Sequence, residues 1–349
     1  MKNSTGEKGW LRPAGKLLMA GVAAFGFTAA AAAQEKVEVK LGITTADDSI
    51  LGINGRMWDK LVQNMTNGRV SVKVFPSGTL GKERAQFEGL VTGSHEAFLH
   101  ISAYTGKYPE VRFWDLPFLF PDTDAVTRVF FSDMYGDLEK VFDKEGMIYL
   151  GSWGYGYRQF SIRNKPYNTP ADLVGQKHRI PGGKSKQLLF EALGANVSTV
   201  SMVELYQALQ SGVVDSQDNP VQIIYSQKFH EVCPYISLLN YNYNPNILAA
   251  GKPFWGKLDK EAQDALKKSA YIMQGWSTQA AERFDALYLT KIKEEKPEIK
   301  INTFDPATLP AWKEKSKPVY AAFEEETSKA YAQNVYQTVE GGFWKPQVK

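Results

Sequence analysis

The segment 37–75 switches between two hydrophobic periods, and this switch constrains the fold more than any other feature of the chain. Residues 37–43 (VEVKLGI) alternate apolar and polar side chains, as a half-buried strand does. Residues 49–65 then carry apolar side chains at helical spacing, Asn67-Gly68 favours a turn, and residues 69–75 (RVSVKVF) alternate again. A strand, a helix and a second strand in this order favour an α/β fold with parallel strand pairing.

Strand and helix signals continue to alternate further along the chain. Residues 147–153 (MIYLGSW) are typical of a buried strand, and Ser201 with Glu204 has the spacing of a capping box before a helix. Residues 213–215 are expected to form a short strand. A further helix is expected to begin around Asn219-Pro220, and this placement makes Asn219 a neighbour of free backbone N–H groups.

Residues 259–295 predict one unusually long helix. The segment contains no proline and a single glycine, Gly275. At ~1.5 Å per residue such a helix is about 54 Å long, which exceeds the width of one small domain. We therefore expect it to pack along two lobes, with its mixed charges on a solvated face.

The first 33 residues predict a secretory signal peptide. Four basic residues precede the uncharged apolar run 17–33, which ends in an A-x-A pattern, so cleavage is expected near Ala33-Gln34. The run is shorter than the roughly 20 apolar residues that span a bilayer, although an uncleaved anchor is the alternative interpretation. We expect an exported protein that resides in the periplasm.

The charge that remains after this leader argues against a nucleic-acid partner. Residues 1–33 carry four Lys or Arg and one Glu, a net charge of +3, and the whole chain is also +3. The rest of the chain is therefore formally neutral. A nucleic-acid-binding protein needs an excess of cations over one surface, so no nucleic acid is expected as a partner.

Two motifs that suggest a cofactor or a metal fail on their spacing. The P-loop pattern that ends in Gly183-Lys184-Ser185 requires a glycine where His178 stands. His95 and His100 are five residues apart, which places them on different faces of either a helix or a strand. Cys233 is the only cysteine, so it is expected to be a buried structural residue. No cofactor, no metal and no catalytic residue is predicted.

Two arginines in glycine-rich, aromatic surroundings are the strongest candidates for binding. Arg158 (GYGYRQF) and Arg179 (KHRIPGG) each follow a predicted short strand. Ligands of open α/β sheets bind at the carboxyl ends of strands, and a guanidinium matches a carboxylate with two parallel hydrogen bonds. Taken alone, either arginine is better explained as a partner in a surface salt bridge. Together with Asn219 in VVDSQDNP, they predict a carboxylate site.

These motifs resemble the DctP-like solute-binding receptors of tripartite ATP-independent periplasmic (TRAP) transporters. The most specific part is the arginine pair about twenty residues apart that is followed by D-x-Q-[DE]-N-P. The matching segments cover nearly the whole chain beyond the leader: 66–93, 115–122, 157–182, 191–220, 225–232 and 254–266.

The resemblance implies a two-lobe periplasmic-binding-protein fold, in which crossing strands join two α/β lobes and a long helix spans them. The resemblance also implies that the two lobes close on the ligand. The implied domains are a signal peptide (1–33), lobe I (35–155 plus about 245–258), lobe II (156–244), the spanning helix (259–295) and a C-terminal helical segment that packs on the lobes (296–349).

The resemblance also assigns binding residues. Arg179 matches the arginine that grips the ligand carboxylate, Arg158 matches a second carboxylate or polar contact, and Asn219 matches an asparagine that reaches the ligand. Weaker candidates by position are Tyr155, Trp153, His100, Thr44, Tyr225 and Tyr241. Some relatives have an acidic residue around position 100, so that contact is not transferred. Whether Trp153 and Tyr155 stack on the ligand or only pack the lobe stays open.

The implied function is a monomeric periplasmic receptor, not an enzyme, that captures a small organic acid and delivers it to membrane permease subunits. A ligand sensor of the same fold is one alternative. An exported enzyme that acts on organic acids is another, and it would need a general acid–base set near the arginines. The sequence does not identify the acid, although its aromatic residues favour sugar acids or aromatic acids over C4 dicarboxylates.

Overall fold

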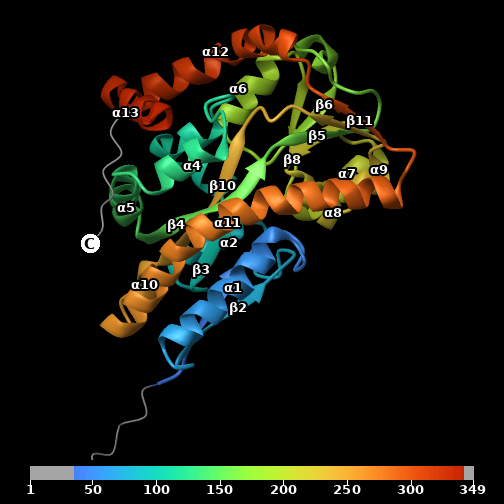
Figure 1. The fold of residues 1–349 in the computed structure, drawn as a ribbon. Coiled ribbons are helices and arrows are strands. Elements are labelled where there is room, and N and C mark those ends of the chain that lie inside the picture. Colours follow the sequence, from blue (N-terminus) through green and yellow to red (C-terminus); the bar gives the residue numbers. More distant parts are fainter. Residues whose placement is uncertain (1–34, 342–349) are drawn as a thin grey trace, which may run out of the picture. The chain divides into compact units, whose positions relative to one another are not determined.

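Two β-sheets organise the part of the chain that the computed structural model describes, residues 35–341 (Figure 1). The signal peptide expected at residues 1–33 lies outside these residues. The first sheet has five strands in the order β2 (Val70–Phe75), β1 (Val37–Gly42), β3 (Ala97–His100), β10 (Tyr243–Gly251) and β4 (Met147–Tyr157). The second has six, in the order β11 (Lys300–Thr303), β9 (Tyr235–Leu238), β5 (Gln159–Ile162), β8 (Ser216–Asn219), β6 (Lys177–Ile180) and β7 (Asn196–Thr199).

Helices accompany both sheets. Those between the strands of the first sheet are α1 (Ile50–Met65), α2 (Glu83–Thr92), α3 (Ser102–Thr105), η1 (Pro109–Asp115), α4 (Thr123–Phe130) and α5 (Met134–Lys144). Those between the strands of the second are η2 (Pro170–Leu173), α6 (Lys184–Ala192), α7 (Met202–Ser211), α8 (Val221–Ser226) and α9 (Phe229–Val232). After β10 follow α10 (Lys252–Trp255), α11 (Lys260–Glu295), η3 (Pro306–Thr308), α12 (Leu309–Glu326) and α13 (Lys329–Glu340).

The strand–helix–strand unit predicted at the start of the fold is confirmed. β1 and β2 pair in parallel, with Val39 opposite Val72. Ser49 caps α1 by accepting a hydrogen bond from the backbone of Gly52. Trp58, on the inner face of α1, is fully buried, so the apolar positions that predicted the helix form its core contact.

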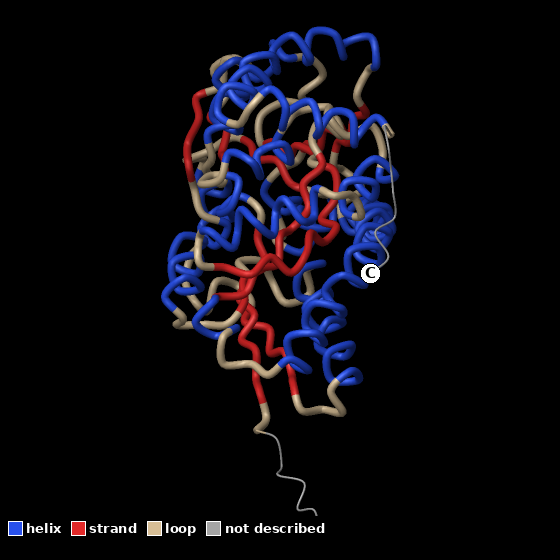
Figure 2. The backbone as a smooth tube through the Cα atoms, turned by 90° about the vertical axis from the view of Figure 1, so that its left-hand side faces the viewer, coloured by secondary structure: helices blue, strands red, loops and turns tan. Residues whose placement is uncertain are grey.

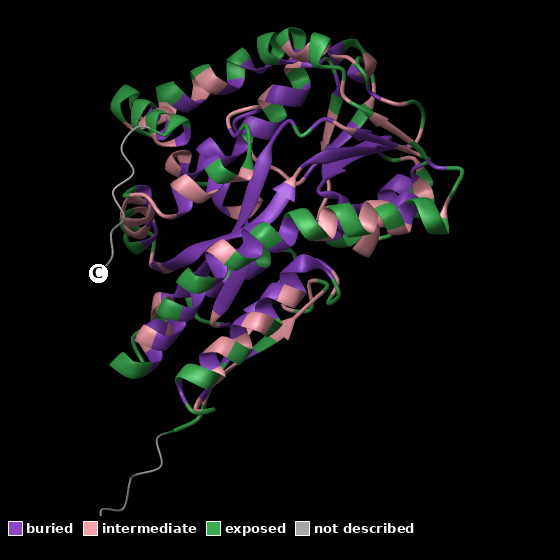
Figure 3. Cartoon of the chain, viewed as in Figure 1, coloured by how far each residue is buried: buried purple, intermediate pink, exposed green. Residues whose placement is uncertain are grey.

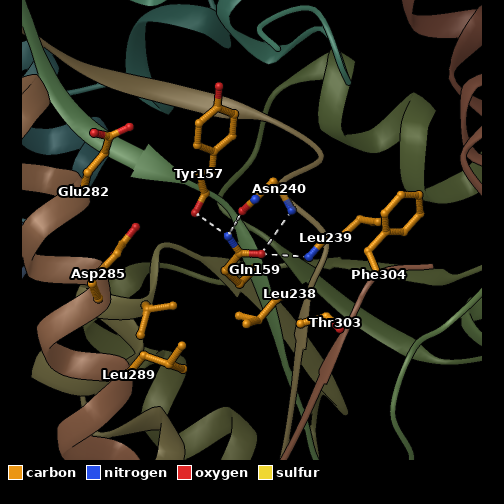
Figure 4. A pocket seen from close by; sticks show the side chains of 12 residues that line it. Tyr157, Gln159, Leu238, Leu239, Asn240, Glu282, Asp285, Leu289, Thr303 and Phe304 are labelled. Carbon is orange, nitrogen blue, oxygen red and sulfur yellow. Dashed lines mark hydrogen bonds between the residues drawn. The ribbon is translucent and has the colours of Figure 1, made fainter. Parts of the chain in front are cut away.

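The chain crosses between the two sheets at two neighbouring places. β4 of the first sheet continues through Arg158 into β5 of the second, and residues 239–242 lead from β9 back to β10. The Gln159 carboxamide joins these crossings, because its oxygen accepts from the backbone N–H groups of Leu239 (2.8 Å) and Asn240 (3.1 Å). Its nitrogen donates to the Asn240 side chain and to the Tyr157 carbonyl (Figure 4).

Helix α11 runs past both sheets, and the continuous helix predicted over 259–295 is confirmed (Figures 1 and 2). Asp259 caps its first turn. Its inner face is lined by small residues, and Ser277 accepts from the backbone of Gly154 at 2.8 Å. A Cβ on Gly154 would lie 2.5 Å from the Thr278 Cα, so only glycine permits this approach. The opposite face of α11 is exposed (Figure 3).

Three element predictions are corrected by the structure. The strand expected at 213–215 begins only at Ser216 and ends at Asn219, whereas the helix expected around Asn219-Pro220 is confirmed, since Pro220 is the N-cap of α8. The capping box at α7 does not form, because the Ser201 hydroxyl bonds to the Glu204 carboxylate (2.6 Å) and not to the helix backbone. Residues 296–341 are not purely helical, since β11 adds a strand to the second sheet.

Cys233 is buried and unpaired, as predicted. Across residues 35–341, none of the helices combines the length and the apolar character needed to span a membrane.

Candidate functional site

A small enclosed cavity lies where strands of both sheets end. Its volume is ≈ 20 Å³, room for about one water. Thr44 follows β1 and His100 ends β3 in the first sheet, while Arg179 and Asn219 lie at the ends of β6 and β8 in the second. The site therefore forms at the carboxyl ends of strands, as expected for an α/β fold. The structure brings six of the predicted residues to its lining: Arg179, Arg158, Asn219, Tyr155, His100 and Thr44.

Arg179 presents a buried guanidinium with a free edge. Its Nε donates to the Val200 carbonyl at 2.7 Å, whereas both terminal nitrogens have no hydrogen-bond partner among residues 35–341. The side chain is only 1% exposed, and burial lowers the pKa of Arg179 to about 10 against the opposing charge of Glu83. Arg179 is therefore still a cation at neutral pH. A buried cation with an unpaired planar edge favours a carboxylate placed against it.

The turn after β6 holds Arg179 in this position. Ile180 is buried in the core on the neighbouring position of the strand. Gly182 and Gly183 then adopt φ angles of 113° and 94°, which side chains rarely tolerate, and α6 begins directly afterwards. The glycines of the KHRIPGG motif thus turn the chain, and they do not cradle a phosphate.

Arg158 lines the same cavity but is already paired. Its Nε bonds to the Asp218 carboxylate, and its terminal nitrogens bond to the Asp218 carbonyl and to Asn244 Oδ1. Although burial opposes ionisation, the charges of Arg158 and Lys186 hold the pKa of Asp218 well below its usual range. Arg158 and Asp218 therefore form a buried ion pair with little net charge, whereas Arg179 lacks such a partner.

A second layer of polar groups supports this ion pair. The Tyr241 hydroxyl donates to Asp218 Oδ2 (2.5 Å), and Lys186 Nζ lies 3.8 Å from the same oxygen. Burial lowers the pKa of Lys186 to about 8. His178 Nδ1 lies 2.9 Å from the Ser216 hydroxyl, and burial lowers the pKa of His178. Tyr241 and His178 thus belong to the layer of polar groups around the ion pair, and neither of them lines the cavity.

Tyr155 and Trp153 have different environments although they are two residues apart on β4. The pairing of β4 with β10 shifts register at Asn244/Pro245, which leaves Tyr155 as an extra residue on its strand. The Tyr155 hydroxyl reaches the cavity and donates to Asn219 Oδ1 at 3.1 Å. Trp153 instead packs edge-on against Trp58 and donates to a carbonyl of α11, so it belongs to the core.

Tyr225 lies away from the cavity. Its ring stacks on Tyr288 of α11 at 4.6 Å, and its hydroxyl donates to Glu295 at 2.6 Å. Of the nine residues predicted from the sequence, Trp153, Tyr225 and Tyr241 are therefore not brought to the cavity lining.

The cavity also contains polar groups that sequence reasoning missed. Glu83, at the start of α2, lines it and accepts from the backbone N–H of Met202 on α7 at 2.8 Å. Asn246 of β10 has a buried amide nitrogen without a partner in the described part of the chain, and the same holds for the Thr44 hydroxyl. In the sequence, Glu83 lies among other charged residues and Asn246 lies in an asparagine-rich stretch, so neither residue is distinguished from its neighbours.

His100 contributes a neutral ring to the cavity. Burial lowers the pKa of His100 to about 4, and the positive charge of Arg179 acts in the same direction although Glu83 opposes it. The backbone N–H of Ala103 approaches His100 Nδ1 at 3.3 Å. Within residues 35–341 there is no group of three or more His, Cys, Asp or Glu side chains that could hold a metal ion. The arrangement can bind one anionic group on Arg179 and polar groups around it.

Comparison with known proteins identifies the family of this chain. Residues 41–327 match the family model described as bacterial extracellular solute-binding protein, family 7 (DctP). The 2,3-diketo-L-gulonate-binding periplasmic protein YiaO of Escherichia coli is 31% identical over 255 residues, which cover 73% of this chain and 76% of that protein. The C4-dicarboxylate-binding periplasmic protein DctP of Vibrio cholerae is 29% identical over 291 residues, 81% of this chain and 85% of the relative.

A solved structure gives the same result for the fold. The sugar acid binding protein DctPAm of Advenella mimigardefordensis, in complex with galactonate, superposes with a TM-score of 0.84 at 26% identity and covers 88% of this chain and 99% of its own. The predicted fold of two α/β lobes joined by crossing strands is confirmed by this match and by the two sheets. The chain belongs to the DctP family of bacterial extracellular solute-binding proteins, the receptors of TRAP transporters.

Proposed function

We propose that this receptor captures a small organic acid by placing the ligand carboxylate against the free edge of Arg179. The observation that carries the proposal is the buried, unpaired pair of terminal nitrogens on Arg179. Asn219 and Tyr155 form the adjoining wall, and Arg158 contributes the N–H groups that Asp218 and Asn244 leave free.

The free energy of binding requires more than one contact between the receptor and the ligand. Micromolar binding needs about 8 kcal/mol, and a hydrogen bond to a charged group contributes roughly 1.5–3 kcal/mol. Arg179 alone therefore does not suffice, and the free groups of Asn246 and Thr44 supply additional partners. Because the cavity holds about one water, a ligand enters only when the lobes separate, and closure then removes its carboxylate from solvent.

The export and delivery steps complete the proposal. The relatives named above are periplasmic binding proteins. We propose that residues 1–33 direct this chain to the periplasm, where it acts as a monomer, binds its ligand without transforming it and delivers it to the permease subunits of a TRAP transporter.

A thermal-shift screen of organic acids tests the proposal. A ligand that binds only the folded state raises the melting temperature, and the shift grows with the logarithm of its concentration relative to its dissociation constant. We expect at least one small carboxylate to raise it, with the neutral sugar alcohol of the same carbon skeleton as the matched control. If no carboxylate in a panel of dicarboxylates, 2-oxo acids, sugar acids and aromatic acids stabilises the protein, the proposed function is wrong.

A further inference from the structure

The cavity holds one free positive charge and one free negative charge, which come from different lobes. Arg179 is at the end of β6 in the second sheet, and Glu83 begins α2, next to the first sheet. The Glu83 carboxylate raises the pKa of Arg179, so the two charges influence one another. Among the ion pairs of residues 35–341, however, none joins Glu83 to Arg179, and their charged atoms are therefore separated by more than 4.0 Å.

The other titratable groups that line the cavity, Arg158 and His100, add no unpaired charge, and Lys186 contacts Asp218 at 3.8 Å without lining the cavity. Arg158 is neutralised by Asp218, which is fully buried and bonded to it at two points. His100 is neutral, because burial lowers its pKa to about 4. Among the described residues that line the cavity, Arg179 is therefore the cation without a partner on its terminal nitrogens, and Glu83 is a carboxylate that accepts from a backbone N–H and has no cation within 4.0 Å.

We infer that Glu83 determines the charge class of the ligand: it selects a hydroxylated monocarboxylate and rejects a dicarboxylate. The inference rests on the function proposed above, with the ligand carboxylate on Arg179. A hydroxyl group of the ligand can donate to the half-buried Glu83 carboxylate, whereas a second ligand carboxylate beside Glu83 meets a like charge. Like charges that share a site repel one another, so Glu83 disfavours dianions.

The free neutral groups of the cavity fit the same ligand class. The Thr44 hydroxyl and the Asn246 amide nitrogen are buried and have no partner among the described residues. Both come from the first sheet, after β1 and on β10, and Glu83 begins the helix that leads into β3 of the same sheet. A hydroxyl can both donate and accept, so a polyhydroxylated chain satisfies Thr44, Asn246 and Glu83 together. A bare hydrocarbon spacer between two carboxylates leaves these groups unpaired.

Glu83 also accepts a hydrogen bond from the other lobe. A variant that removes the charge of Glu83 must therefore keep this hydrogen bond. Glu83 Oε1 accepts from the Met202 N–H at 2.8 Å, which takes the place of the missing capping bond from Ser201. A glutamine at position 83 keeps an oxygen that can accept this hydrogen bond. Glu83→Gln therefore removes the charge and leaves the contact between α2 and α7 in place.

The test compares two acids with one carbon skeleton, galactonate with one carboxylate and galactarate with two. Their dissociation constants are measured by titration calorimetry on the wild-type protein and on Glu83→Gln. We expect the wild type to bind galactonate at least about tenfold more tightly than galactarate, and Glu83→Gln to reduce this ratio by about tenfold or more. Glu88→Gln is the matched control, since Glu88 is an exposed residue of the same helix, paired with Arg84, and should leave the ratio unchanged.

The outcomes separate this inference from the proposed function. An equal galactonate-to-galactarate ratio in the wild type and in Glu83→Gln overturns the inference, and so does a wild type that prefers galactarate or binds neither acid. In each case the proposed function stands if another carboxylate binds and loses its affinity on Arg179→Gln. The function itself fails only when no carboxylate depends on Arg179.

Discussion

At the scale of single residues, the two buried arginines that line one cavity differ in their charged partners. Arg158 is part of a closed ion pair with Asp218, and Arg179 carries a charge that nothing in residues 35–341 neutralises. A buried ion pair that loses one partner leaves an uncompensated charge, which is expensive. A buried unpaired cation is itself a cost, which ligand binding removes. The two arginines should therefore respond to substitution in different ways.

We predict that Arg158→Ala lowers the free energy of unfolding by about 3 kcal/mol, because Asp218 stays buried without its main partner. Arg179→Gln should change the same quantity by less than about 1.5 kcal/mol, since only the hydrogen bond to Val200 is at stake. Urea unfolding of both variants without ligand measures the difference. Equal losses in the two variants would contradict the assignment of roles.

The sequence predicted the two arginines that the structure brings to one cavity, but it did not predict how their partners differ. The motifs around Arg158 and Arg179 are local, whereas the partner of Arg158 is 60 residues away in the chain. Glu83 enters the cavity only because α2 and α7 approach one another across the two lobes. Such pairings depend on tertiary structure, and a single sequence contains no periodic signal for them.

At the scale of elements, the prediction succeeded where hydrophobic periodicity was strong. The helix over 259–295 and the first strand–helix–strand unit follow from apolar spacing and the absence of proline. β8 was misplaced, because its sequence SQDN is entirely polar although all four residues are buried. Val213, which suggested a strand, is 59% exposed. A buried polar strand satisfied by other polar groups is a property of the binding site, and hydropathy patterns do not reveal it.

The contact between α11 and α8 predicts a pH dependence of stability. Asp285 of α11 accepts from the Gln222 N–H in the first turn of α8 at 2.9 Å. Burial raises the pKa of Asp285 to about 8, with Glu282 acting in the same direction, and the unfolded value is 3.8. A group whose pKa is raised in the folded state stabilises fully below its unfolded pKa and loses this contribution as the pH rises through the folded value.

We therefore expect Asp285→Asn, which stays neutral and keeps an acceptor, to gain stability relative to the wild type as the pH rises from about 4 to about 8. The gain should reach at least about 1 kcal/mol. Thermal melts of both proteins at pH 5 and pH 8 measure it, and groups common to both proteins cancel in the difference. A difference that is the same at both pH values would show that Asp285 ionises normally.

At the scale of the whole molecule, the chain joins the two lobes three times: once through α11, which leads from β10 to β11, and twice at neighbouring crossings that share one side chain. The Gln159 carboxamide holds both of them, beside a cavity of ≈ 510 Å³ that Asp285, Phe304 and residues of both crossings line (Figure 4). Any opening of the lobes must bend the chain at this point. The cavity at Arg179 has a volume of only ≈ 20 Å³, so the proposed binding of an organic acid requires such an opening.

We predict that Gln159→Ala lowers the free energy of unfolding by about 1–3 kcal/mol, because the buried N–H of Leu239 loses its acceptor. The loosened crossing should also shift the protein towards open forms, which small-angle X-ray scattering detects as a larger radius of gyration without ligand. Gln207→Ala, on the exposed face of α7, is the control and should leave both quantities unchanged. A Gln159→Ala protein as stable and as compact as the control would show that the crossings do not depend on this side chain.

The most direct test of the whole account is a calorimetric titration of the carboxylate that gives the largest thermal shift, into the wild-type protein and into Arg179→Gln. The account predicts that the dissociation constant rises by about 100-fold or more, because two hydrogen bonds to a charged group are lost in a closed cavity. A folded Arg179→Gln protein that binds the acid with wild-type affinity would contradict the claim that Arg179 is the carboxylate anchor.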